Sequence, residues 1–269
     1  MHKAGFVNIV GNPNVGKSTL MNALVGERIS IITSKSQTTR HRIMGIVNGA
    51  DFQIVYSDTP GALKPNYRLQ ESMLEASESA FKDADVLLYV TDTVESYDKN
   101  LDFLDKVRKM QTPIFLIINK IDLLSSQKEL EDLVDKWETV LPNARIIPIC
   151  AKEKFNVENL LTQIKELLPE SPAYFDKDAL TDRPARFFVT EIIREKILEL
   201  YDKEIPYSSE VVVEKFVEDK KIIHINAVIY VERDSQKSII IGKGGSMLKK
   251  VGMMARKDVE AFFQKKVFL

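Results

Sequence analysis

The sequence predicts an α/β domain with a mixed six-stranded sheet, followed by a smaller α+β domain. In the first two-thirds of the chain, short apolar runs alternate with helix-length amphipathic stretches, a pattern typical of a mainly parallel sheet with helices on both faces. Prolines at 169, 172 and 184 flank a polar stretch without clear periodicity, which we interpret as a linker. Beyond it, the order changes to a helix, two long β-like runs and a helical region, which indicates an α+β module.

The first domain is predicted to contain six strands and five helices. Five strands are short apolar runs at 6–10, 53–57, 86–90, 114–118 and 145–150. The run 43–48 is joined to the next one by the turn-like Gly49-Ala50-Asp51, so we predict an antiparallel edge strand. The helices are predicted at 17–25, 69–81, 100–109, 126–140 and 157–168.

The second domain is predicted to contain a helix at 187–202, strands at 209–218 and 221–232, and a helical region at 236–266. The whole chain has 38 Lys and Arg against 39 Asp and Glu, so no overall field favours a polyanionic partner. The last 35 residues, from Ser235, hold 8 basic and 2 acidic residues, a net charge of +6. A nucleic-acid partner would therefore meet this local basic region.

The composition excludes several classes of protein. Of the 269 residues, 44% are hydrophobic and 29% are charged, values that exclude a disordered chain. The single cysteine, Cys150, cannot form an internal disulfide and fits a reducing compartment. No apolar run approaches the roughly 20 residues of a membrane span, and the start lacks the apolar stretch of a secretory leader. We therefore expect a soluble protein of the cytoplasm.

The first candidate site is a phosphate-binding loop between the first strand and the first helix. It has the pattern GxxxxGK[ST], formed by Gly11, Asn12, Pro13, Asn14, Val15, Gly16, Lys17 and Ser18, and Thr19 follows it. The glycines let backbone N–H groups surround a diphosphate, and the helix adds its positive N-terminus. Lys17 reaches the β and γ oxygens, and Ser18 offers a hydroxyl to Mg²⁺. The alternative is a glycine turn that only joins strand to helix.

The second candidate site follows the strand at 53–57 and reads Asp58-Thr59-Pro60-Gly61. A carboxylate beside the phosphate-binding loop can hold Mg²⁺ through water, and the N–H of Gly61 can bind a γ-phosphate. The alternative is a common turn. The distance of 40 residues from Ser18 to Asp58 favours the metal site.

The third candidate site, Asn119-Lys120-Ile121-Asp122, follows the strand at 114–118. The carboxylate of Asp122 can accept hydrogen bonds from N1–H and the 2-amino group of guanine, whereas adenine has neither donor there. The stem of Lys120 can cover the base plane. A solvated turn is the alternative, but together with the first two sites this segment indicates GTP rather than ATP.

The order of these motifs, followed by Cys150-Ala151-Lys152, resembles that of small GTPases of the translation-factor type. The resemblance implies GTP and GDP as ligands, Mg²⁺ as cofactor, and contact between the main chain near Ala151 and the guanine oxygen. Serine normally precedes the alanine in that family, and here cysteine takes its place. Because the implied contact is with the main chain, the resemblance holds, but it assigns no role to the thiol.

The polar loop at 36–42 carries two adjacent threonines. The resemblance implies that one of them closes over Mg²⁺, and we predict Thr39, with Thr38 or a merely solvated loop as alternatives. The implied metal ligands are then Ser18, Thr39 and Asp58.

Position 62 is also informative, because it holds alanine where Ras-like enzymes have a glutamine that orients water. Hydrolysis is therefore expected to be slow or assisted from elsewhere. In related GTPases with this substitution, an asparagine of the phosphate-binding loop holds K⁺, and Asn14 matches that position. Its alternative role is that of a turn residue. The predicted catalytic residues are Asn14, Lys17, Thr39 and Gly61.

The last candidate site is the turn Gly242-Lys243-Gly244-Gly245, inside the basic end of the chain. A Gly-x-x-Gly turn between two helices lets a sugar-phosphate chain approach closely, and flanking apolar residues such as Ile241 can contact unstacked bases. Lys243, Lys249 and Lys250 attract phosphates. The alternative is a turn that only joins two helices, but the preceding helix and two strands make the module resemble a type II KH domain.

A KH domain after such a GTPase resembles the Era family of ribosome-assembly GTPases, over nearly the whole chain. Further similar segments are Thr181-Asp182-Arg183-Pro184, Glu191-Ile192-Ile193-Arg194-Glu195-Lys196 and Val231-Glu232-Arg233. The resemblance implies a GTPase domain at 1–172, a linker at 173–184 and a KH domain at 185–269. The family continues with a final strand and a basic tail where this sequence ends at Leu269, so we expect the last strand to be incomplete.

The function implied by this resemblance is that of a GTP-dependent switch that binds the 3′ end of small-subunit (16S) ribosomal RNA and the 30S subunit. The protein would assist maturation of that subunit. A monomeric state and a peripheral contact with the inner face of the cell membrane are further expectations. Two other functions stay open: a phosphotransferase with a small acceptor, and an RNA-binding protein whose GTPase half is only a scaffold. Multiple turnover of GTP distinguishes the switch from the scaffold.

Overall fold

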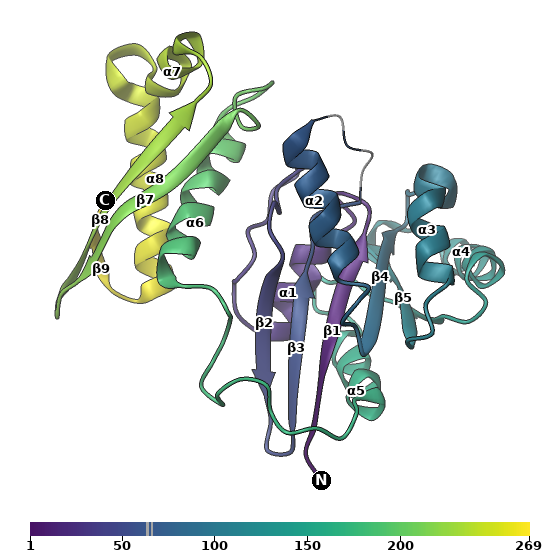
Figure 1. The fold of residues 1–269 in the computed structure, drawn as a ribbon. Coiled ribbons are helices and arrows are strands. Elements are labelled where there is room, and N and C mark those ends of the chain that lie inside the picture. The colour runs from purple at the N-terminus through teal and green to yellow at the C-terminus, as the bar shows by residue number, and fades with distance from the viewer. Residues whose placement is uncertain (63–64, 66) are drawn as a thin grey trace. The chain divides into compact units, whose positions relative to one another are not determined.

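The structure, a computed structural model, describes residues 1–62, 65 and 67–269 (Figure 1). Contacts group the described residues into two units. The first contains residues 1–30 and 39–182, and the second contains residues 31–38 and 183–269. The second unit thus includes a short segment from the N-terminal half of the chain.

The first unit is built on a mixed six-stranded sheet with the order β2-β3-β1-β4-β5-β6. Its strands are β1 (Lys3–Gly11), β2 (Ile43–Asn48), β3 (Phe52–Asp58), β4 (Val86–Asp92), β5 (Ile114–Asn119) and β6 (Arg145–Pro148). β2 pairs antiparallel with β3, and the other pairs are parallel, which confirms the predicted mixed sheet and its antiparallel edge strand. β6 ends two residues earlier than predicted, because Cys150 pairs with Phe155 instead.

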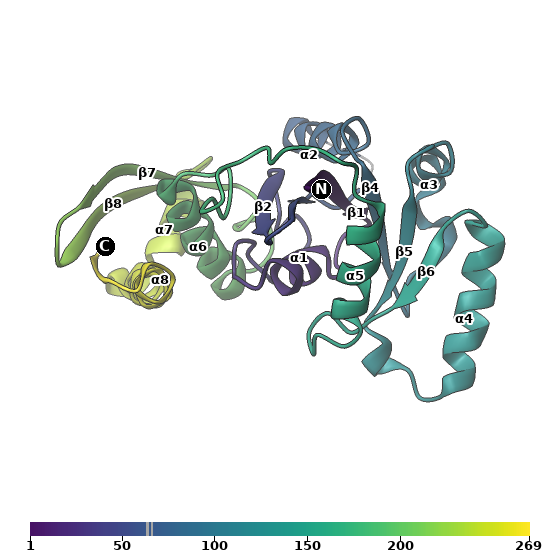
Figure 2. The same cartoon turned by 90° about the horizontal axis from the view of Figure 1, so that it is seen from below.

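Helices cover both faces of this sheet. They are α1 (Lys17–Val25), α2 (Arg68–Ser79), α3 (Leu101–Arg108), α4 (Gln127–Val140) and α5 (Val157–Leu167), with 3₁₀ turns η1 (Tyr97–Asn100) and η2 (Ile121–Leu123). Figure 2 shows α2 and α3 on one face and α1 and α5 on the other. On the face with α3, the buried Trp137 of α4 packs edge-on against Tyr89 of β4, with ring centroids 6.0 Å apart.

The register of the parallel strands gathers the predicted motifs at one edge. Ile9 of β1 pairs with Asp58, the last residue of β3, and Asp92 at the end of β4 pairs with Asn119 at the end of β5. Gly11 ends β1 beside them. In an open α/β sheet, ligands bind at the carboxyl ends of the strands, so the sheet itself positions the candidate site.

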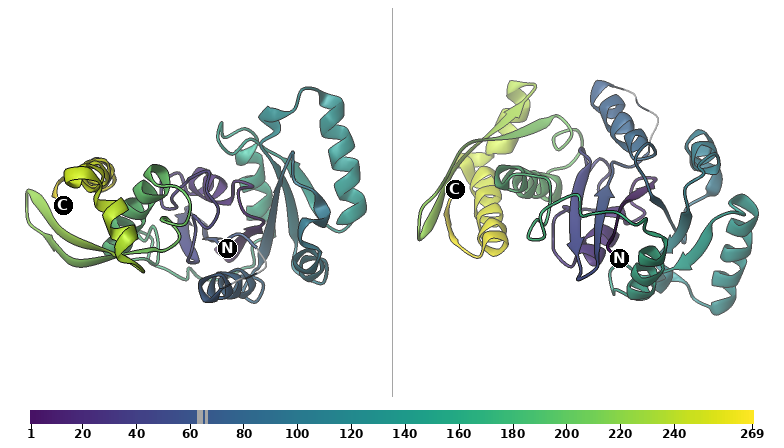
Figure 3. Two further views of the ribbon diagram at one scale, coloured as in Figure 1. Left: turned by 90° about the horizontal axis from the view of Figure 1, so that it is seen from above. Right: turned by 60° about the horizontal axis from the view of Figure 1, so that its bottom comes forward.

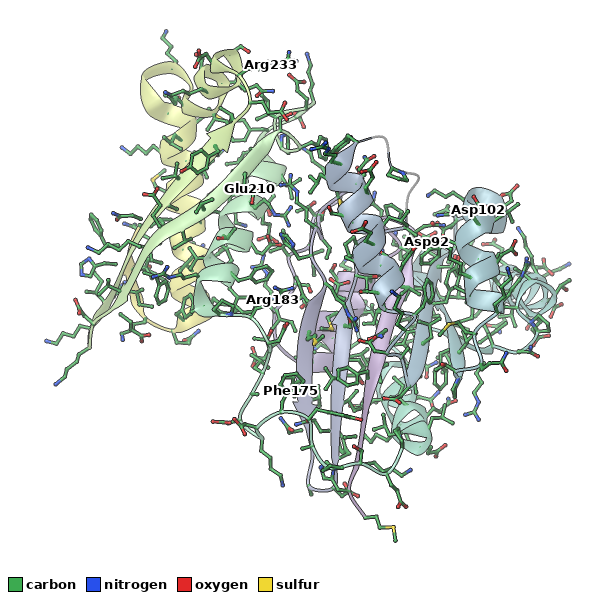
Figure 4. All side chains as sticks on the ribbon, viewed as in Figure 1. Asp92, Asp102, Phe175, Arg183, Glu210 and Arg233 are labelled. Atoms are coloured by element: carbon green, nitrogen blue, oxygen red, sulfur yellow. The ribbon has the colours of Figure 1, made fainter. Side chains whose placement is uncertain are left out.

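Residues of the predicted linker contact β2 and the start of β3. The backbone N–H groups of Tyr174 and Phe175 donate to Oε1 of the buried Gln53, at 2.7 and 3.0 Å (Figure 4). The N–H of Ile46 donates to the carbonyl of Leu180 at 2.8 Å. Residues 173–182 therefore belong to the first unit by their contacts.

The second unit contains a three-stranded sheet with the order β7-β8-β9 and helices on one side (Figure 3). Its elements are α6 (Ala185–Leu200), β7 (Ser209–Glu218), β8 (Ile222–Val231), α7 (Asp234–Ile241), η3 (Lys243–Gly245), α8 (Ser246–Phe263) and β9 (Lys266–Phe268). α6 and α8 bury apolar residues such as Ile193 and Val251 against Ile223 and Ile225 of β8. This arrangement confirms the predicted α+β module.

No helix in the described parts of the chain is both long enough and apolar enough to span a bilayer.

Candidate functional site

The N-terminus of α1 is arranged to receive an anion. Gly16 precedes the helix with a φ of 96°, and an alanine Cβ there would lie 2.2 Å from Nδ2 of Asn119. Among the described residues, no side chain caps this end of α1, and its first turn contains no acidic residue. The free N–H groups and the helix dipole together favour a phosphate at this position.

Lys17 is nearly buried, and its ammonium donates to the carbonyl of Asn12 at 2.8 Å. Burial lowers the pKa of Lys17 to about 8, although the carboxylate of Asp58 opposes the shift. A phosphate beside this ammonium would favour the charged form.

Three oxygen-bearing side chains meet at the predicted metal position. The hydroxyl of Ser18 donates to Oδ2 of Asp58 at 2.7 Å, and Oγ1 of Thr39 lies 3.0 Å from Oγ of Ser18 and 3.4 Å from the same carboxylate oxygen. Asp58 is fully buried, and its Oδ1 has no hydrogen-bond partner among the described residues. Burial raises the pKa of Asp58. A buried carboxylate with an unsatisfied oxygen, next to two hydroxyls, fits a small cation that prefers oxygen ligands, as Mg²⁺ does.

The two adjacent threonines of the loop differ in their contacts. Oγ1 of Thr38 donates to the carbonyl of Lys35 at 2.6 Å and lies 2.6 Å from Oγ1 of Thr33. Thr38 is thus bonded within its own loop, whereas Thr39 lies against Ser18 and Asp58. The structure therefore brings Thr39 to the predicted metal position.

Asn119 and Lys120 join the phosphate-binding loop to the other motifs. Nδ2 of Asn119 donates to the carbonyl of Val15 at 2.9 Å, and its Oδ1 accepts from the N–H of Ala151 at 3.0 Å. Nζ of Lys120 donates to the carbonyl of Asn14 at 2.6 Å and pairs with Oδ2 of Asp92 at 2.8 Å. These bonds connect the phosphate-binding loop, the segment after β5 and the loop that contains Ala151.

Asp122 and Cys150 complete the predicted base site. Asp122 is exposed, so its carboxylate is accessible to a base. Cys150 is buried, and burial raises the pKa of its thiol, as does its hydrogen bond with Asp122. The thiol, to which the resemblance assigned no role, thus lies beside Asp122. Lys152 is largely exposed and pairs with Glu153 at 3.7 Å.

The segment after β3 is packed against the phosphate-binding loop. An alanine Cβ at Gly61 would lie 2.7 Å from backbone atoms of Pro13, and the N–H of Ala62 donates to the carbonyl of Gly11 at 3.1 Å. Ala62 is buried in the apolar core below the site. The predicted residues Thr59 and Pro60 bond elsewhere: Oγ1 of Thr59 donates to the carbonyl of Ile9, and the carbonyl of Pro60 accepts from Ser77.

Two acidic residues of this edge were missed by the sequence reasoning. Asp92 pairs with Lys120, and its Oδ1 accepts from the N–H groups of Val94 and Glu95. Burial raises the pKa of Glu95, whose Oε2 accepts from Thr91 at 3.1 Å. The signal that could have found Asp92 (labelled in Figure 4) is its place at the end of a fully buried strand.

The candidate RNA interface lies at the turn between α7 and α8. Gly242, Gly244 and Gly245 have φ values of 70°, 59° and 77°, which other residues rarely adopt, so the backbone makes a tight turn. Side chains at Gly244 or Gly245 would meet open space. Nothing among the described residues would therefore block a phosphate chain at this turn.

The surroundings of this turn combine positive charge with apolar surface. The lysines 243, 249 and 250 are all exposed. The large apolar residues Ile239, Ile241 and Leu248 are 50%, 36% and 41% exposed. A pocket of about 670 Å³ adjoins Gly245 and Lys249 and is lined by residues of β8 and α8. Exposed apolar side chains beside lysines suit a chain of bases and phosphates.

Comparison with known proteins identifies both units. Residues 6–120 match the family described as 50S ribosome-binding GTPase, and residues 204–269 match the KH domain family. A solved structure of Era in complex with MgGDPNP and nucleotides 1506–1542 of 16S ribosomal RNA is 36% identical to this chain. The match covers 100% of this chain and 92% of that one, with a TM-score of 0.95. The chain belongs to the Era family.

Other solved structures agree with this placement. A variant of Era from Aquifex aeolicus bound to GDP and aluminium fluoride is 36% identical, with coverage of 99% of this chain and 92% of that one and a TM-score of 0.94. The elongation factor SelB from Methanococcus maripaludis, at 22% identity and a TM-score of 0.50, covers 66% of this chain and 36% of its own, and shows the fold alone. As an Era-family member, the chain combines a GTPase domain with a KH domain.

Proposed function

We propose that this protein is a GTP-dependent switch that binds the 3′ end of 16S ribosomal RNA and assists maturation of the small ribosomal subunit. The observation that carries the proposal is the meeting of Ser18, Thr39 and Asp58 beside the open N-terminus of α1. A triphosphate bound there, with Mg²⁺, gives Thr39 and Gly61 a partner that a diphosphate lacks. The Era structure with MgGDPNP and 16S ribosomal RNA supports both ligands.

The roles of the site residues follow from their positions. Lys17 and the N–H groups of the phosphate-binding loop hold the phosphates, and Asp122 and the N–H near Ala151 hold the guanine. Ser18, Thr39 and Asp58 would hold Mg²⁺, which neutralises charge on the phosphate oxygens when bound. Guanine is preferred because adenine would leave the Asp122 carboxylate without its two donors.

Hydrolysis is proposed to be slow and stimulated by K⁺. Ala62 has no polar side chain with which to orient water and is buried in the core. Asn14 is exposed at the loop that binds the phosphates, so its amide oxygen is available to a monovalent cation. Positive charge placed beside the phosphates would stabilise the transition state in place of a positioned glutamine.

The RNA-binding role is assigned to the turn at 242–245 with Ile241, Lys249 and Lys250. The glycines allow close approach of a phosphate chain, and the lysines supply the attraction. Location in the cytoplasm, peripheral contact with the membrane, a monomeric state and the domain boundaries at 172 and 185 stay predictions.

The test measures RNA and nucleotide binding on the same protein. Gel shift on an RNA with the 3′-terminal sequence of 16S ribosomal RNA, in GDPNP and in GDP, is expected to show different affinities. The double change Lys243→Asp with Gly244→Asp should abolish the shift and leave GDP affinity intact. Lys220→Asp with Lys221→Asp is the control, because it removes at least as much positive charge at the β7–β8 turn. RNA binding that survives the first pair, or falls equally with the second, contradicts the assignment.

A further inference from the structure

Helix α2 of the first unit carries a serine on its buried face. Ser77 is 0% exposed, and Met73 and Ala80, which share this face, are equally buried. A buried hydroxyl is costly unless it forms a hydrogen bond, so the hydroxyl of Ser77 needs a partner within the protein. An alanine would fill most of the same space without this cost, so the hydrogen bond is what the serine adds.

The hydroxyl of Ser77 forms this bond outside its own helix. Its Oγ donates to the carbonyl of Pro60 at 2.6 Å, and the carbonyl of Met73, one turn earlier in α2, lies 3.2 Å away. A serine inside a helix commonly bonds to the carbonyl four residues before it. A hydroxyl has a single proton to donate, and here the contact with Pro60 is the shorter one. The bond therefore connects α2 to the segment 58–61.

The carbonyl of Pro60 and the N–H of Gly61 belong to the same peptide group. A trans peptide group is planar, and its carbonyl and N–H point in opposite directions. No peptide bond of the described residues is cis, so a carbonyl fixed on Ser77 also fixes the direction of the N–H, away from α2. Within the described parts of the chain, this N–H has no hydrogen-bond acceptor. It is available to a ligand.

Other contacts hold the two ends of the same segment. Oγ1 of Thr59 donates to the carbonyl of Ile9 at 2.8 Å, and the N–H of Ala62 donates to the carbonyl of Gly11 at 3.1 Å. Both contacts go to β1 and keep the segment beside the phosphate-binding loop. Neither involves the peptide group that Ser77 contacts, so the orientation of that group depends on the serine.

We propose that Ser77 is a positioning residue for the N–H of Gly61, acting through the peptide group that joins Pro60 to Gly61. The inference rests on the proposed binding of a γ-phosphate at this N–H. A donor whose direction is already fixed loses less conformational freedom when the phosphate binds. GDP has no γ-phosphate, so its affinity is independent of Ser77. Ser77 thereby contributes to the preference for triphosphate over diphosphate.

The test compares two variants of the full chain. Ser77→Ala removes the hydroxyl and nearly keeps the volume of the side chain, and thermal unfolding checks that the variant is folded. Ser72→Ala is the matched control, because it makes the same change in the same helix at an exposed position. Affinities for GDP and GDPNP are measured at saturating Mg²⁺. The amide resonance of Gly61 is followed by NMR with each nucleotide, because a hydrogen bond to a phosphate shifts it.

In Ser77→Ala, the GDPNP-to-GDP affinity ratio is expected to fall about three- to tenfold, the range for one lost hydrogen bond. The difference in the Gly61 resonance between GDP and GDPNP should become smaller, while GDP affinity and the control stay at the wild-type values. An unchanged ratio in Ser77→Ala contradicts the positioning role, even if both affinities fall together. A reduced ratio with an unchanged Gly61 resonance also contradicts it. Wild-type protein that binds neither nucleotide would instead overturn the proposed function.

Discussion

At the scale of single residues, the ammonium of Lys17 links nucleotide binding to pH. Its pKa is lowered to about 8 by burial, and phosphates would raise it again. Because binding favours the protonated form, GDP affinity is fully present below pH 8 and falls as the pH rises through that value. At pH 8.5, calorimetry in buffers of different ionisation enthalpy should show uptake of about 0.8 proton per GDP bound, the fraction of neutral lysine at a pKa of about 8.

The control for this prediction is Lys17→Arg. A guanidinium stays charged up to a pH above 12, so uptake should vanish even where affinity is reduced. Equal uptake in both proteins would mean that another group titrates.

Asn14 carries the second prediction at this scale. Its φ of 67° makes alanine a strained replacement, so Asn14→Gly is the better variant because glycine keeps this conformation without an amide. We expect faster GTP turnover in KCl than in NaCl at equal ionic strength, and no difference between the salts in Asn14→Gly. Turnover that is the same in both salts in the wild-type protein would exclude K⁺ as the activating ion.

Residues also mark the limit of sequence reasoning. The motifs at 11–18, 58–61 and 119–122 have fixed spacing, so their residues and their common edge could be predicted. The sequence could rank Thr38 and Thr39 only by resemblance, because the direction of each side chain depends on backbone rotation in an irregular loop. The contact between Arg194 and the carbonyl of Thr38 could not be predicted, since it spans 156 residues.

At the scale of elements, helix α1 is bounded by two glycines of similar conformation but different surroundings. Gly16 and Gly26 have φ values of 96° and 85°. A Cβ at Gly16 would lie 2.2 Å from Asn119, whereas a Cβ at Gly26 would meet nothing within 4 Å. We expect Gly16→Ala to displace Asn119 and to lower GDP affinity about tenfold or more. Gly26→Ala should cost about 1 kcal/mol of stability and leave GDP affinity unchanged.

Thermal unfolding compares the stability of the two variants, and GDP titration compares their affinity for the nucleotide. Similar losses of affinity would mean that strain in the helix ends, and not the position of Asn119, controls the site.

The elements themselves followed closely from sequence patterns. The predicted bounds of α1, β2 and β7 are the observed ones, and β2 was predicted from the turn that joins it to β3. The helical region at 236–266 is divided in the structure because three glycines with positive φ interrupt it. The break lies at the Gly-x-x-Gly motif, where the sequence predicted a turn between two helices.

At the scale of the whole molecule, the division into units differs from the order of the chain. Residues 31–38 belong with the C-terminal unit, and residues 173–182 belong with the N-terminal one. The sequence analysis predicted a linker at 173–184 because this stretch is polar and flanked by prolines. Its backbone contacts with Gln53 and Ile46 depend on the edge that β2 presents, which only the assembled sheet provides.

This covering of β2 determines how the GTPase half can be isolated. Leu180 and Thr181 occupy the outer edge of β2 through the bond to Ile46 and the bridge to Gly45. A fragment that ends at residue 172 would expose that row of backbone groups, which templates strand addition by another copy. We expect fragment 1–182 to stay monodisperse in light scattering and fragment 1–172 to aggregate. If 1–172 is equally monodisperse, residues 173–182 do not shield the sheet. If it aggregates as expected, the segment that was taken for a spacer also protects the sheet against self-association.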